Sequence, residues 1–90
     1  MDKVMSVDGV PIRLTEERCF RIVENHDDMV GHYDDVLETV ADPDLVLPWY
    51  RGSLIAVRNY GGKRYLLAIY REVSRDDGFV ITAYFGSKIN

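Results

Sequence analysis

The sequence predicts an α+β fold: an N-terminal β-hairpin, two helices, then an antiparallel β-meander of three or four strands that the helices cover on one face. Near the N-terminus, Asp8-Gly9 lies between two short apolar stretches, which is typical of a hairpin turn. Two segments with apolar residues at spacings of three and four follow, as in amphipathic helices. The second half alternates apolar and polar residues between turn signals, as strands do. A chain of 90 residues is long enough for one domain, residues 1–90.

The composition limits the classes of function. The formal net charge is −4, from 15 acidic and 11 basic residues, so the overall field does not attract nucleic acid. Any phosphate contact must come from a local cluster of Arg and Lys. The single cysteine, Cys19, excludes an internal disulfide and is expected to be a buried thiol. The sequence contains neither an apolar run of membrane-spanning length nor a signal-peptide pattern, which predicts a cytoplasmic protein with no membrane contact.

The first predicted elements are a hairpin and a helix. The second strand of the hairpin contains Pro11, which lacks a backbone donor and favours a sheet edge. The helix follows over residues 15–26, with Thr15 as its N-cap and two glutamates in the first turn, where the helix dipole favours negative charge. His26 continues the apolar stripe of this helix at its C-terminal end.

A second helix is predicted over residues 27–42, capped by Asp27 or Asp28. Asp42-Pro43 ends it, because the residue before a proline disfavours the α region. Gly31 weakens its start. Its expected buried face consists of Met29, Tyr33, Val36, Leu37 and Val40.

The strands are predicted around residues 44–48, 53–60, 63–73 and 79–85, with a tight glycine turn at Gly61-Gly62. A five-residue loop before the last strand would pair Val73 with Phe79. One face of the sheet would then carry Tyr70, Glu72, Thr82 and Tyr84, and the helix-covered face Leu67, Ile69, Ile81, Ala83 and Phe85.

The position of Arg58 stays open at this point. A two-residue turn puts it on the helix side, and a three-residue turn puts it beside Tyr70, since a slip of one residue exchanges the two faces. The face with Thr82 and Tyr84 also has two interpretations. It is either the solvated side of the sheet, stabilised by aromatic–threonine pairs, or the lining of a site.

An ordered set of short motifs, covering most of the chain from about Arg13 onward, resembles the barnase–EndoU–colicin–RelE-like nuclease superfamily, in particular its phage-associated branch of small prokaryotic proteins. The motifs are Thr15-x-x-Arg18, His26, Pro43-Asp44, Tyr70-Arg71 and Thr82-Ala83-Tyr84. The resemblance implies a RelE/barnase-like domain of helices followed by a meander sheet. It also implies a metal-independent endoribonuclease, often a toxin of a toxin–antitoxin or phage-conflict system.

Metal-free RNA cleavage needs an acid or base near neutral pKa and cations for the phosphate, and the motif residues offer both. His26 suits acid–base chemistry. Arg18 and Arg71 suit bidentate phosphate contacts, and Arg58 is a further candidate for substrate binding. The remaining candidates are Tyr70 and Tyr84, which can stack on a base or donate to phosphate, and Thr82, which can position a phosphate oxygen.

Each candidate also has a structural interpretation. A histidine at a helix C-terminus is stabilised by the helix dipole, so His26 need not be catalytic. Arg18 in a first helical turn is often solvated or ion-paired, and Arg71 could pair with Asp76 or Asp77. The acidic stretch of residues 26–35 contains two histidines, but its spacing favours a solvated helix face over a metal site. We therefore predict neither a metal nor a cofactor.

Two functions are carried forward. The leading one is an RNA-cleaving, toxin-like enzyme that uses Arg18, His26, Tyr70, Thr82 and Tyr84. The alternative is a non-catalytic module whose open sheet face, with aromatic residues at its rim, binds an antitoxin-like protein partner or closes a homodimer. A nuclease predicts that the cations cluster beside Thr82, and an interface predicts that they are scattered around an apolar patch.

Overall fold

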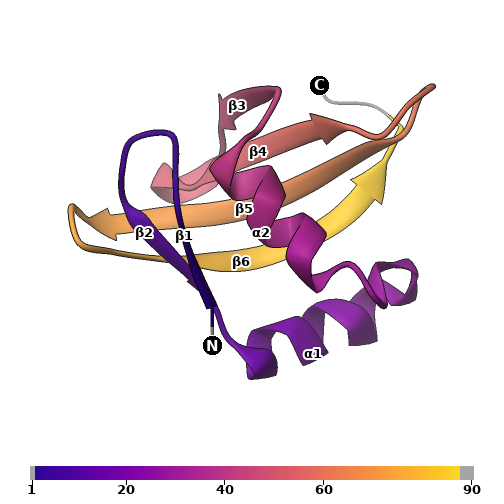
Figure 1. The fold of residues 1–90 in the computed structure, drawn as a ribbon, viewed down its shortest axis with the longest axis horizontal. Coiled ribbons are helices and arrows are strands. Elements are labelled where there is room, and N and C mark those ends of the chain that lie inside the picture. Colours follow the sequence, from indigo (N-terminus) through magenta and orange to yellow (C-terminus); the bar gives the residue numbers. More distant parts are fainter. Residues whose placement is uncertain (1, 88–90) are drawn as a thin grey trace.

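The computed structural model describes residues 2–87 and consists of a six-stranded mixed sheet with two helices, which confirms the α+β class (Figure 1). The helices are α1 (Glu16–Asn25) and α2 (Tyr33–Ala41), and short 3₁₀ turns lie at Asp27–Met29 and Tyr50–Gly52. The strands are β1 (Asp2–Met5), β2 (Pro11–Leu14), β3 (Leu45–Pro48), β4 (Leu54–Asn59), β5 (Tyr65–Ser74) and β6 (Asp77–Gly86).

The N-terminal hairpin belongs to the same sheet as the meander. The strand order is β1-β2-β6-β5-β4-β3, and the pairs from β3 to β6 are antiparallel, as the meander requires. The hairpin joins by a parallel contact between β2 and β6, in register at Arg13 and Phe79. The prediction that the Pro11 segment is a sheet edge is therefore wrong: β2 lies between β1 and β6, and β1 is the edge strand. The physical reason is that Ile12 and Leu14 of β2 are fully buried in the core that the meander also lines.

The two helices occupy different places relative to the sheet. α2 lies across one face and contacts β5, β4 and β1, whereas α1 lies alongside β6 (Figure 1). The core between the helices and the sheet contains Ile22 of α1, three residues of α2 and apolar side chains of five strands. Its buried members are Val10, Ile12, Leu14, Ile22, Met29, Val36, Leu37, Val40, Ala56, Leu66, Ala68, Tyr70, Val80 and Ala83.

The first helix forms as predicted, and the second begins later than predicted. The Thr15 hydroxyl oxygen accepts a hydrogen bond from the Arg18 backbone N–H at 3.0 Å, which confirms the N-cap. Residues 27–29 form a separate 3₁₀ turn, because Gly31 adopts a φ of +83° that no helix can contain. α2 therefore starts at Tyr33, and Asp27 and Asp28 do not cap it.

The register of β5 and β6 differs from the prediction. The connection is a tight turn in which Ser74 pairs with Asp77, so Arg71, and not Val73, lies opposite Phe79. A β-bulge follows in β6, since Ile69 pairs with Thr82 while Tyr70 pairs with Val80.

Compared with the prediction, the observed register moves some side chains to the other face of the sheet and leaves others on the predicted face. Tyr70 and Glu72 turn to the helix-covered face, where Tyr70 has no exposed surface. Thr82 and Tyr84 stay on the face that the helices leave open, as predicted. A second apolar cluster lies on this open face, with Ile55, Val57, Leu67 and Ile69 at its centre and Leu47, Tyr65, Ile81 and Tyr84 around them.

The N-terminal hairpin is also held by a polar contact to β5. The Ser6 hydroxyl donates to a carboxylate oxygen of Glu72 at 2.5 Å, and the same hydroxyl oxygen accepts from the Val10 N–H at 3.2 Å. Burial raises the pKa of Glu72, and the neighbouring carboxyl of Asp8 raises it further, while the Ser6 hydrogen bond opposes both.

Within residues 2–87, no helix combines the length and the apolar composition needed to cross a membrane.

The raised pKa of Glu72 predicts a pH-dependent effect of Glu72→Gln on stability. A carboxyl with a raised folded-state pKa favours folding below its ordinary value of 4.5, and this contribution is lost as pH rises through the folded-state pKa. We expect Glu72→Gln to unfold at higher urea than wild type at pH 7, and the difference to shrink below pH 4.5. The control is Glu24→Gln, which removes the same charge from an exposed helix position. A less stable Glu72→Gln at pH 7 would contradict the prediction.

The tight turn between β5 and β6 predicts that Gly78→Ala is destabilising. A Cβ at Gly78 would collide with the Ile12 side chain and approach the Arg71 carbonyl oxygen to 2.6 Å. Overpacking of this kind costs about 1–3 kcal/mol in the free energy of unfolding. Urea denaturation should show this loss, while Asp76→Ala, in the exposed turn just before β6, should stay close to wild type. Equal urea midpoints for Gly78→Ala and Asp76→Ala would mean that the β5–β6 hairpin can shift to accommodate the methyl group.

Candidate functional site

One edge of the sheet gathers most of the residues singled out in the sequence. Among the described residues, β2 pairs with β6 only at Arg13 and Phe79, and α1 lies beside the rest of β6. We call this surface the α1–β6 edge; it runs from Arg18 and Phe79 at one end to His26 and Tyr84 at the other.

The far end of the α1–β6 edge is formed by a histidine and a tyrosine. His26 terminates α1, and its backbone N–H donates to the Ile22 carbonyl at 2.8 Å. Its half-buried ring stacks on Tyr84 of β6, with ring centroids 5.4 Å apart and planes inclined by 28°. Thr82 precedes Tyr84 by two residues on the same open face. This end therefore brings together an imidazole, a phenol and a hydroxyl.

The near end of the α1–β6 edge contains a cavity of about 280 Å³. It lies where β2 leaves β6 and the chain turns into α1. Its lining residues are Arg13, Thr15, Arg18, Phe79 and Val80. The Thr15 hydroxyl caps α1 as an acceptor, so its own O–H remains available as a donor.

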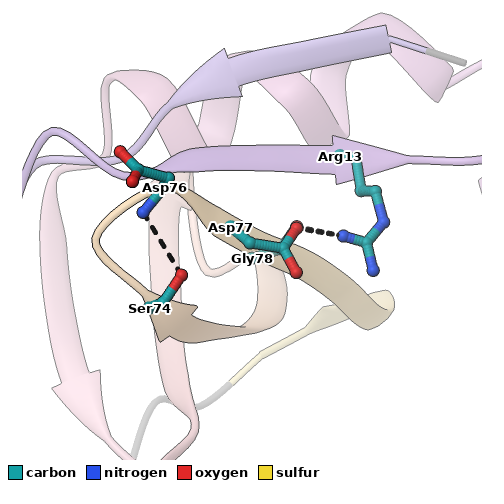
Figure 2. Close-up of polar contacts among 5 residues, drawn as sticks. All are labelled: Arg13, Ser74, Asp76, Asp77 and Gly78. Carbon is teal, nitrogen blue, oxygen red and sulfur yellow. Dashed lines mark hydrogen bonds and ion pairs between the residues drawn. The ribbon is translucent and has the colours of Figure 1, made fainter.

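Arginines flank Phe79 on both sides. Arg13 of β2 and Arg71 of β5 are its cross-strand neighbours, and the Arg13 guanidinium carbon lies 5.6 Å from the centre of the Phe79 ring. Arg13 is paired with Asp77 (Figure 2). It also donates to the Gly78 carbonyl at 3.3 Å. Both bonds use one terminal nitrogen, which leaves the other N–H donors of Arg13 open to a ligand.

Arg18 and Arg71 have no acidic partner among the described residues. Neither the Arg18 nor the Arg71 side chain makes an ion pair or hydrogen bond with a residue in the described range. Asp77, one expected partner of Arg71, is bound to Arg13. The acidic chain thus has two arginines, Arg13 and Arg18, that line a cavity with Phe79, and a third, Arg71, on the strand next to it, which together form the kind of local cluster that a phosphate contact needs.

The two ends are too far apart for a single phosphate group. Arg18 and His26 are eight residues apart, which corresponds to about 12 Å along the helix axis. Helical side chains lean toward the N-terminus, so Arg18 extends toward the cavity at Phe79 and away from His26. The α1–β6 edge is therefore a two-part site, with cations at one end and a titratable ring at the other.

Two predicted site residues lie elsewhere. Tyr70 is fully buried beneath the helices, its hydroxyl has no hydrogen-bond partner among residues 2–87, and burial raises its pKa to about 12. It has no exposed ring surface for stacking on a base. Arg58 lies on the helix-covered face, 3.9 Å from the Glu38 carboxylate of α2, and donates to the Asp42 carbonyl at 3.3 Å. The loop after it spans three residues, so it does share the face of Tyr70.

Some residues near the site were not anticipated. Arg13 and Phe79 were missed because only the parallel pairing of β2 with β6 brings them together. A second histidine, His32, bonds the Asp35 carboxylate at 2.8 Å and lowers the pKa of that carboxyl. Its ring meets Phe85 edge-on at 5.0 Å, and the Arg64 guanidinium lies 3.9 Å from the centre of the Phe85 ring. Residues three apart on a helix are neighbours, so the spacing of His32 and Asp35 in the sequence could have predicted this contact.

Within residues 2–87, no group of three or more His, Cys, Asp or Glu side chains is arranged to hold a metal ion. Comparison of the chain with protein-family models, with curated proteins and with solved structures finds no match.

Proposed function

We propose that the protein is a metal-independent, toxin-like endoribonuclease of the RelE-like type, and that its RNA substrate lies along the α1–β6 edge. The motif resemblance supports the class. The observation that carries the proposal is that a half-buried imidazole stacked on Tyr84 shares one edge with Arg18, while Arg71 lies beside Phe79 on the next strand, and neither guanidinium has a partner among residues 2–87. The local cations supply the phosphate affinity that the overall charge of −4 does not.

In this proposal His26 acts as the acid–base group. It takes the proton of a ribose 2′-hydroxyl, O2′ attacks the adjacent phosphorus, and the P–O5′ bond breaks. The imidazolium returns the proton to O5′, which leaves a 2′,3′-cyclic phosphate and a free 5′-hydroxyl. Thr82 donates a hydrogen bond to a phosphate oxygen, and stacking on Tyr84 holds the imidazole in orientation.

The arginines then have a binding role at neighbouring phosphates. Arg18 and Arg71 both lie toward the Phe79 end, so they hold the RNA chain on one side of the cut and do not contact the scissile phosphate itself. Tyr70 and Arg58 have no part in this mechanism, because both lie on the helix-covered face.

The proposal predicts cleavage of single-stranded RNA in EDTA and its loss in His26→Ala. Removing an acid–base group should lower the cleavage rate by about 10²–10⁴-fold. The products of the wild-type reaction should carry 2′,3′-cyclic phosphates, and an all-deoxy oligonucleotide should not be cut because it lacks O2′. Gel electrophoresis of labelled oligonucleotides measures the rate, and mass spectrometry identifies the ends.

The matched control is His32→Gln, which removes the second histidine from the helix-covered side of the sheet. It should cut RNA at the wild-type rate once thermal melts show that it is folded. Cleavage that survives in His26→Ala would refute the role of His26. Absence of cleavage by folded wild-type protein would refute the proposed activity.

The apolar open face favours a second candidate function, a homodimer that pairs through this face. Its central residues Val57 and Leu67 are apolar and buried by their neighbours, and Trp49 and Tyr50 are 44% and 74% exposed at the connection from β3 to β4. A second copy presenting the same apolar surface would complete a sheet-on-sheet core.

This candidate predicts a dimer in sedimentation velocity experiments at micromolar concentration. Ile81→Glu, at the margin of the open face, should produce a monomer, because the glutamate would be desolvated in the interface. Val30→Glu places the same charge on a residue that is 64% exposed outside that face and should leave the dimer intact. A monomeric wild-type protein would eliminate the candidate.

A further inference from the structure

We propose that the cavity at Phe79 is a nucleotide subsite separate from the His26 end, and that it holds the base and phosphate of a second nucleotide of a single-stranded nucleic acid. The proposal rests on the proposed function, because it assigns the substrate of that same edge as an oligonucleotide. It adds Arg13 and Phe79, which no sequence motif indicated, and it gives Thr15 of the Thr15-x-x-Arg18 motif a role in ligand binding.

The lining of the cavity selects the class of ligand. Arg13 and Arg18 provide planar donors that match phosphate oxygens, and the open O–H of Thr15 adds a further donor. An anionic phosphodiester, with two oxygens that can each accept hydrogen bonds, is the group that this set of donors fits.

The aromatic wall distinguishes a nucleotide from a bare anion. Phe79 is partly exposed and lines the cavity together with the two guanidiniums. A nucleobase stacks both on aromatic rings and on guanidinium planes, and such stacking tolerates any base. Arg71, opposite Phe79 on the open face, extends the cationic surface along the path of the backbone.

The length of the α1–β6 edge sets the minimum size of the substrate. The separation of about 12 Å between Arg18 and His26 along the helix axis exceeds one nucleotide step in a stacked strand, about 3.4 Å. A nucleotide in the cavity therefore belongs to a different position from the nucleotide that is cut. The subsite contributes affinity and register, and it makes no contact with the reacting atoms.

The test is binding of a fluorescein-labelled, all-deoxy octanucleotide, measured by fluorescence anisotropy at low salt. This probe lacks O2′ and cannot be cleaved, so the result does not depend on the proposed chemistry. Phe79→Leu should weaken binding by about fivefold or more, since one stacked base contributes about that factor. Phe79→Tyr should restore it. Phe20→Leu, on the outer face of α1 with 66% exposure, is the matched control and should bind like wild type.

Arg18→Gln should weaken binding and reduce the salt dependence by about one phosphate contact. The control is Arg21→Gln, whose arginine lies 3.8 Å from the Glu17 carboxylate and does not line the cavity. An abasic octanucleotide and inorganic phosphate serve as competitors. Both should compete much more weakly than the base-containing strand.

The outcomes separate the subsite from the catalytic proposal. If Phe79→Leu binds like wild type, or the abasic strand binds equally well, the nucleotide subsite is overturned, whatever the RNA cleavage assay shows. If the octanucleotide binds as predicted and wild-type protein cuts no RNA, the subsite stands and the ribonuclease proposal fails. If both hold, Phe79→Leu should raise KM for RNA and leave kcat unchanged, while His26→Ala should lower kcat.

Discussion

The parallel contact between β2 and β6 is the constraint on which the rest of this structure depends. It attaches the N-terminal hairpin to the meander at Arg13 and Phe79 and brings Ile12 and Leu14 into the common core. Because β2 then leaves the sheet, the chain enters α1 beside β6 and not above it. The cavity at Phe79 lies in the fork that results.

The β-bulge in β6 is the second constraint, since it decides which side chains share a face. By adding one residue to β6 between Val80 and Thr82, it lets both Ala83 and Tyr70 point into the helix-covered core. Thr82 and Tyr84 thereby remain on the open face, next to α1. Bulges often reorient side chains near functional sites, and the position of this one beside the α1–β6 edge fits that pattern.

The electrostatics of the edge are local. The chain as a whole is acidic, yet Arg13 and Arg18 line one cavity with Phe79, and Arg71 is the cross-strand neighbour of Phe79 on β5. Of these three arginines, only Arg13 has a carboxylate partner among the described residues. The other cluster of titratable groups, around His32 and Asp35, is internally paired, so its charges are compensated. The arginines at Phe79 therefore suit the binding of an anion, whereas the paired charges of His32 and Asp35 stabilise the fold.

The sequence by itself determined the α+β class, the hairpin, the first helix with its Thr15 cap and the four meander strands, because these follow from local periodicity, capping and turn residues. It also placed Thr82 and Tyr84 on the open face. Only the tertiary structure decided that Tyr70 is buried, that Arg58 bonds to α2, and that Arg13 and Phe79 belong to the candidate site. The physical reason is that strand pairing at long sequence separation and a one-residue bulge are set by the fit of the whole core, while the alternating pattern of a strand is the same in either register.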